Sequence, residues 1–201
     1  MNAPTRVRAV VPGLRGRGVL LAAPQDADRI RAALESAGFV VTEADLRHDG
    51  DGHSTARPTA DTLDADPTPS SMRAAQAAIA TALRLPETAG RNLDALVDSL
   101  RDLATWWPQE ERIVLLIHGA ESLVESDLPG WHTLTEILRE ASADLWRGGV
   151  EGDRAFETVA LVRHHGVPVL PEDEATPEAP SDASPSWGDS RADEDPAGWP
   201  T

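Results

Sequence analysis

The run of five apolar residues from Ile113 to Ile117 constrains the fold of this chain more than any other segment. No polar residue alternates with the apolar ones, so both faces of such a strand have to be buried. Strands covered on both faces are typical of parallel sheets, whose crossover helices pack against the sheet. We therefore predict an α/β fold in which this run is a central strand.

Strands and helices alternate on both sides of this run. A β-α-β pattern precedes it, with strands at 18–22 and 39–44, and a last strand follows at 155–163. Helix-bearing crossovers normally join parallel strands with a right-handed connection. Apolar residues recurring at helical period predict further helices, which we place at about 26–36, 70–85, 92–100 and 129–146. The expected fold is a small parallel β-sheet flanked by helices.

Composition divides the chain into one domain and two ends. Residues 1–17 mix proline, glycine and arginine, and we expect a flexible arm there. The domain spans 18–165 and includes a long surface loop at 48–69, which has no periodicity. Residues 166–201 hold nine acidic residues and the single basic residue Arg191. A proline-rich acidic segment of this kind cannot bury enough apolar area to offset its ordering entropy, so we expect a disordered tail.

The charge and cysteine content limit the possible partners. A net charge of −16 disfavours binding to nucleic-acid phosphates and favours a basic partner. The absence of cysteine excludes thiolate metal sites and fits a reducing compartment. No apolar run approaches the roughly 18 residues of a membrane span. We expect a cytoplasmic chain that binds no membrane, needs no cofactor or metal, and is monomeric when free; Asp49, Asp51 and His53 are interpreted as solvated loop residues.

The segment from Leu85 to Leu100 contains a helix with one apolar and one acidic side. Its apolar stripe recurs at helical period, while Asp94 and Asp98 stand four residues apart on the other side. Like charges at this spacing destabilise an isolated helix by about 0.2–0.5 kcal/mol. The spacing alone favours a solvated acidic face in which Asp98 pairs with Arg101.

The whole segment, however, carries a specific motif. The run Leu-Pro-Glu-x-x-Gly-x-Asn-Leu-Asp-Ala-Leu-x-Asp, which begins at Leu85, closely resembles the signature of the barstar family, intracellular inhibitors of a secreted ribonuclease. The resemblance extends over roughly 70–165 and includes the Leu-Arg-Glu-Ala run at 138–141. It implies a barstar-like fold with an extra N-terminal βα unit, since the β-α-β pattern at 18–45 looks like that of actinobacterial-type relatives.

The resemblance also implies which residues bind the partner. In the family, the loop and helix of the signature plug the ribonuclease active site, and carboxylates occupy the positions of substrate phosphates. By position in the motif, Asp98 matches the principal inhibitory aspartate and Asp94 the second one. Glu140, in the Leu-Arg-Glu-Ala run, matches an outlying acidic contact. The implied partner is therefore a basic ribonuclease.

Five residues of the motif shape the rest of the implied interface. Gly90 and Asn92 match loop residues that set the approach to the helix, and Arg91 lies between them. Thr88 and Val97 stand where the best-known member has aromatic residues that pack on the enzyme. Because aromatic anchors usually carry much of the binding energy of an interface, their loss implies a weaker inhibitor or a target of different shape.

Two other classes of function remain as alternatives. A barstar-fold interaction module would bind a non-nuclease partner, through Trp187, Trp199 or the acidic tail. An enzyme would need a reactive constellation, but the chain has no Gly-x-Ser-x-Gly elbow and no lysine for a phosphate loop. Asp94 and Asp98 lie on an exposed helix where nothing would raise a carboxyl pKa for acid–base work. We therefore predict a binding protein and not an enzyme.

Overall fold

The computed structural model describes residues 6–47, 70–146 and 154–163. Within these residues, four strands form a single sheet in the order β1-β4-β3-β2, and every neighbouring pair is parallel. Their bounds are β1 Val19–Ala22, β2 Val40–Asp45, β3 Arg112–His118 and β4 Ala155–Leu161. The predicted α/β fold with a small parallel sheet is confirmed.

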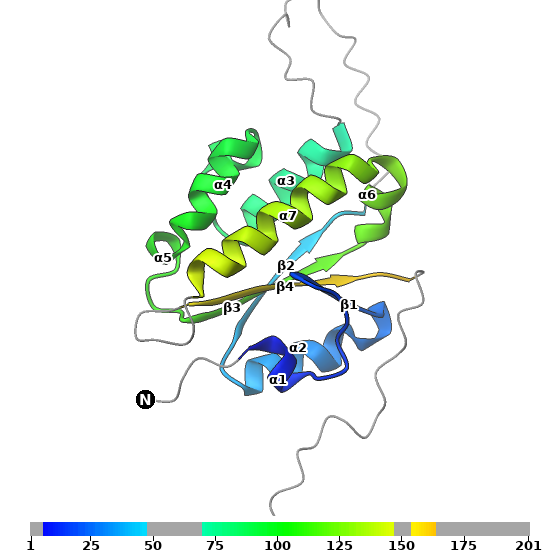
Figure 1. Cartoon of the computed structure of the whole chain (residues 1–201), viewed down its shortest axis with the longest axis vertical. Helices are drawn as coiled ribbons and strands as arrows, with labels where there is room; N and C mark the ends of the chain where they lie inside the picture. Colours follow the sequence, from blue (N-terminus) through cyan, green and yellow to red (C-terminus); the bar gives the residue numbers. More distant parts are fainter. Residues whose placement is uncertain (1–5, 48–69, 147–153, 164–201) are drawn as a thin grey trace, which may run out of the picture.

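Strand β3 lies inside the sheet, between β2 and β4. Leu115 is in register with Thr42 on one side and Thr158 on the other, and all residues of Ile113–Ile117 are buried. The apolar run, which predicted a central strand covered on both faces, is therefore confirmed as an interior strand of the sheet. Helices lie on both sides of it (Figure 1).

The two faces of the sheet carry unequal helical layers. One face is covered by α3 (Ser70–Ala82), α4 (Leu93–Arg101), α6 (Ala120–Ser126) and α7 (Leu128–Leu145), with the short α5 (Leu103–Trp106) beside them; the other is covered by α1 (Val7–Val10) and α2 (Ala27–Ser36) (Figure 1). Two 3₁₀ turns, η1 (Pro24–Asp26) and η2 (Glu87–Gly90), precede α2 and α4. The periodicity did not predict α5 and α6, because elements of 4 and 7 residues are too short to show a helical repeat.

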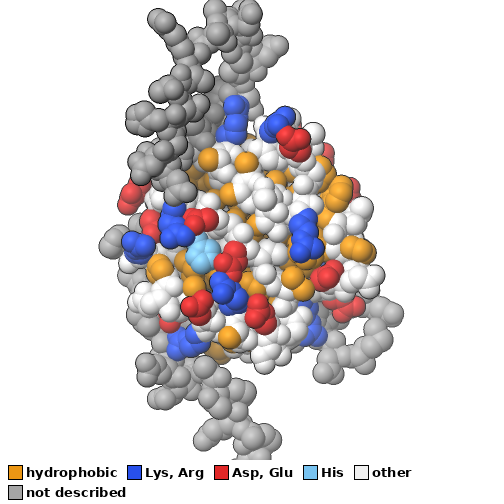
Figure 2. Space-filling model, turned by 180° about the vertical axis from the view of Figure 1, so that it is seen from behind, with side chains coloured by type: hydrophobic (Ala, Val, Ile, Leu, Met, Phe, Trp, Pro, Cys, Tyr) orange, Lys and Arg blue, Asp and Glu red, His pale blue; other side chains and the backbone are white. Residues whose placement is uncertain are grey.

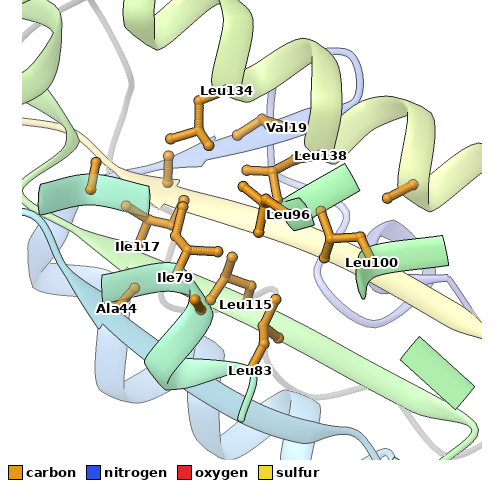
Figure 3. Close-up of a cluster of buried hydrophobic side chains, with 14 of the residues drawn as sticks. Val19, Ala44, Ile79, Leu83, Leu96, Leu100, Leu115, Ile117, Leu134 and Leu138 are labelled. Atoms are coloured by element: carbon orange, nitrogen blue, oxygen red, sulfur yellow. The ribbon is translucent and has the colours of Figure 1, made fainter. Parts of the chain in front are cut away.

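The larger core cluster holds α3, α4 and α7 against the sheet. Leu96 and Leu100 of α4, Leu138 of α7 and Leu115 of β3 belong to this cluster, and all four are almost fully buried (Figure 3). Burying one such side chain is worth about 1.5–3 kcal/mol. The acidic helix is therefore attached rigidly to the domain by its apolar side.

The expected flexible arm over residues 1–17 is corrected from Arg6 onward. Val7, Val11 and Leu14 are buried in the second core cluster, on the α2 side of the sheet. Arg6 Nε donates to Glu157 Oε1 at 3.0 Å, and the Val7 N–H donates to Glu157 Oε2 at 2.5 Å. The proline, glycine and arginine content of this segment predicts a flexible arm, but three apolar residues within it pack on the α2 side of the sheet.

Other parts of the expected domain organisation lie outside the described residues. These are positions 1–5, the loop at 48–69 with its Asp49, Asp51 and His53, and the tail at 166–201 with Trp187 and Trp199. Among the helices that are described, none combines the length and apolar character that crossing a bilayer requires.

Candidate functional site

Asn92 fixes the start of α4. Its backbone is extended, and its side-chain oxygen accepts hydrogen bonds from the backbone N–H of Asp94 at 2.8 Å and of Ala95 at 3.4 Å. This is the arrangement of an N-cap, which satisfies donors that the first helical turn leaves free. The predicted helix start is confirmed, and Asp94 lies in the first turn, where the helix dipole favours a negative charge.

The η2 turn that leads into Asn92 is held tightly against α3. Ala89 and Gly90 are buried, and a Cβ on Gly90 would lie 3.3 Å from the Cα of Ala77. The buried amide of Gln76 donates from Nε2 to the carbonyl oxygen of Ala89 at 2.7 Å. Glycine at position 90 therefore permits a close approach of two backbones, and Gln76 anchors the turn.

The carboxylates of Asp94 and Asp98 both face solvent. The side chain of Asp98 is 76% exposed, and its Oδ1 lies 3.6 Å from Nη1 of Arg101. The ion pair expected from spacing is present, but this distance is longer than a hydrogen bond. Within the described part of the chain, the Asp94 carboxylate has no hydrogen bond or ion pair. A partner can therefore reach both groups.

A second acidic row on α7 lies across a shallow groove from α4. Glu140 and Asp144 are exposed, one turn apart, on the side of α7 that meets α4. The groove between the helices is lined by Val97, Leu100, Arg101, Ile137, Glu140, Ala141 and Asp144. The groove is thus lined by both charged and apolar side chains. Glu140 lies on the same surface of the molecule as α4.

The neighbouring acidic residue Glu136 is engaged by its own helix. A side-chain hydrogen bond from Arg139 holds the pKa of Glu136 below its ordinary value. Arg139 also lies 3.7 Å from Glu140, a looser pair in which Glu140 remains 56% exposed. Of the two, Glu140 is the carboxylate more available to a partner.

Three further residues of the implied interface lie beside this surface. Thr88 is exposed, and its carbonyl oxygen accepts from the N–H groups of Arg91 and Asn92, both at 3.1 Å. Arg91 is exposed and pairs with Glu87. Val97 is half-buried in the groove. The structure therefore brings all eight expected site residues to one region, while their role in binding stays a prediction.

Sequence reasoning missed three residues that the structure places here. The spacing predicts Arg101 only as an ion-pair partner of Asp98, yet Arg101 lines the groove and also lies 3.8 Å from Asp144. Asp144 follows Glu140 by four residues, and this spacing in the sequence indicates that both lie on the same side of the helix. Gln76 gave a weaker signal, a single polar residue within the apolar side of a helix, and it anchors η2.

The arrangement is suited to binding cationic groups of a partner. Ionised carboxylates on a rigid helix accept charge-assisted hydrogen bonds, which are stronger than neutral ones. No group of three or more metal-ligating side chains occurs in the residues that the structure describes. On the reverse of the molecule, acidic and basic side chains are interspersed (Figure 2).

A comparison with protein families gives a match to the signature region. Residues 64–160 match the family model described as Barstar (barnase inhibitor). The match contains α3, α4, β3, α7 and all eight site residues, whereas β1, α2 and β2 precede it. Neither curated proteins nor solved structures gave a match.

Proposed function

We propose that this chain, which belongs to the barstar family over residues 64–160, inhibits a ribonuclease by covering its active site with the exposed side of α4. The observation that carries the proposal is the pair of solvent-facing carboxylates, Asp94 and Asp98, on a helix whose other side is fixed in the core. Family membership alone supports a protein partner; the geometry supports a cationic one.

A ribonuclease active site offers what these carboxylates bind. It has to hold RNA phosphates, and basic side chains do so through charge-assisted hydrogen bonds. Residues at i and i+4 of a helix have Cβ atoms about 5–6 Å apart, so Asp94 and Asp98 present two negative groups at a fixed spacing. Because the N-cap and the η2 turn already order this surface, little conformational entropy is lost when it binds.

The charge of the whole chain supports the same partner. A net charge of −16 attracts a basic enzyme over long range, and such steering raises association rates about 10- to 1000-fold at low salt. An inhibitor of this kind would protect the cell that produces the nuclease. A location inside that cell is part of the proposal.

The apolar side of the interface is modest. Thr88 and Val97 offer little area for a partner to cover, so the proposal assigns most of the recognition to charge. Binding by exposed charges is screened by salt. We therefore expect inhibition to weaken steeply as ionic strength rises.

The test is inhibition of RNA cleavage by the full chain. Two probes are barnase, the enzyme named in the family description, and a ribonuclease encoded by a neighbouring gene. The chain should inhibit at least one of them, and Asp98→Ala should weaken inhibition by about 3–5 kcal/mol, because it leaves a buried cation of the enzyme unpaired. Asp28→Ala is the matched control, since Asp28 is an exposed carboxylate that pairs with Arg31 on α2.

Two results would contradict the proposal. One is a chain that inhibits neither enzyme. The other is an Asp98→Ala variant that inhibits as well as the wild-type chain while circular dichroism shows the same fold.

A further inference from the structure

Arg101 is a cation at the centre of the acidic surface. It lies in the last turn of α4, with Nη1 3.6 Å from Asp98 Oδ1 and Nε 3.8 Å from Asp144 Oδ2. Both distances are longer than a hydrogen bond, and the side chain is 57% exposed. None of its side-chain N–H groups donates a hydrogen bond to any residue that the structure describes. The five side-chain donors of Arg101 are therefore without a hydrogen-bond acceptor among the described residues, and the side chain is open to solvent.

A partner that covers Asp98 also covers Arg101, because the two charged groups are 3.6 Å apart. Water then leaves both, and a charge removed from water is tolerated only if it is paired and hydrogen-bonded. Asp98 cannot satisfy Arg101 fully while it also binds a cation of the partner. Arg101 consequently needs an acceptor that the partner itself supplies.

We infer that Arg101 determines which ribonuclease this surface accepts: the partner presents a carboxylate opposite Arg101, next to the cations that meet Asp94 and Asp98. A ribonuclease with a cation at that point is disfavoured by like-charge repulsion. The surface thus has the order acid, base, acid along Asp98, Arg101 and Asp144, and the partner has the complementary order. This inference rests on the proposed function and names the chemistry of its partner.

The competing explanation is a structural one, in which Arg101 only ties α4 to α7. Exposed pairs at these distances contribute little to stability. The helices are already joined through Leu96, Leu100 and Leu138 in the core. An unfolding measurement on the free chain therefore separates the two roles, since a specificity residue leaves the urea midpoint unchanged.

The experiment uses the full chain and the ribonuclease that it inhibits in the assay above. Arg101→Ala should weaken inhibition about 30-fold or more, as expected when one partner of a buried charge pair is removed. Arg101→Glu should weaken it further, and replacing the facing carboxylate of the enzyme by arginine should restore it. Arg163→Ala is the matched control, an arginine that is 65% exposed, lies 3.6 Å from Glu121 and does not line the groove, and it should leave inhibition unchanged.

The outcomes separate this inference from the proposed function. If Asp98→Ala abolishes inhibition while Arg101→Ala inhibits equally well, the proposed function stands and the inference is wrong. If Arg101→Ala inhibits more strongly, Arg101 competes for Asp98 instead of binding an acceptor, and the inference is again wrong. If the wild-type chain inhibits no ribonuclease, both fail.

Discussion

Gln76 is the residue whose replacement best tests how the fold positions the site. Its side chain is 1% exposed, and its amide donates to the carbonyl oxygen of Ala89 at 2.7 Å. Methionine has nearly the same length and volume, so Gln76→Met removes the donor without opening a cavity. The substitution changes one hydrogen bond and leaves the site residues themselves intact.

The expected cost follows from what the change leaves behind. The carbonyl of Ala89 lies in a buried turn and loses its side-chain donor, and an unsatisfied buried group costs about 1–3 kcal/mol. For a chain of this size each kcal/mol lowers Tm by about 2–4 °C. The η2 turn also becomes less ordered, so the inhibition constant should rise, though less than in Asp98→Ala.

Urea unfolding and the inhibition constant are measured on the same preparations. The control is Thr81→Ala, because Thr81 lies on the same helix and its hydroxyl bonds the carbonyl of Ala77 in an exposed position. That variant should change the unfolding free energy by less than about 0.5 kcal/mol. A Gln76→Met chain with wild-type stability and wild-type inhibition would refute the view that this hydrogen bond anchors the site.

Two further predictions concern the other face of the sheet. Arg6→Ala leaves the buried carboxylate of Glu157 without its cation and should lower the unfolding free energy by about 1–3 kcal/mol in urea; an unchanged midpoint would show that the N-terminal segment is not held by this pair. The side-chain hydrogen bond from Arg47 holds the pKa of Asp45 below its ordinary value of 3.8. The stabilisation is therefore present above that value and is lost as the pH falls through the lower folded-state pKa. Asp45→Asn should slightly reduce the slope of the unfolding free energy against pH in this acid range; the effect is small because the pair is half exposed. Equal slopes for the two chains would contradict a stabilising role of the Asp45–Arg47 pair.

Much of the fold was predictable because its main elements carry either an unbroken apolar run or an apolar stripe at helical period. The run Ile113–Ile117 predicted the buried strand β3, and the stripe along Leu93–Leu100 predicted α4 with Asn92 at its start. The strand order was not predictable from periodicity, because period reports burial and not which strand pairs with which. Thus β1 and β2, consecutive along the chain, lie at opposite edges of the sheet.

The position of the candidate site in the fold was predictable in part for a similar reason. The motif that begins at Leu85 located Asp94 and Asp98 within one helix. Within a helix, the spacing of two residues determines whether their side chains lie on the same side. Contacts between elements distant in sequence were not accessible in this way. Arg101 reaches Asp144 across the α4–α7 groove, and Gln76 reaches Ala89 from another helix. The packing of Val7, Val11 and Leu14 was not predicted, because the composition of residues 1–17 favours a flexible arm. These three separate apolar residues nevertheless attach the segment to the core.

Under the proposed function, the carboxylates on α4 take the places of RNA phosphates in a ribonuclease active site. The most direct test of this placement is the apparent inhibition constant of the wild-type chain, measured against the inhibited ribonuclease over a range of RNA concentrations at fixed salt. Competition for one site predicts an apparent constant that rises linearly with RNA concentration. An apparent constant that does not change with RNA concentration would show that the chain binds outside the active site, and would contradict the proposed function.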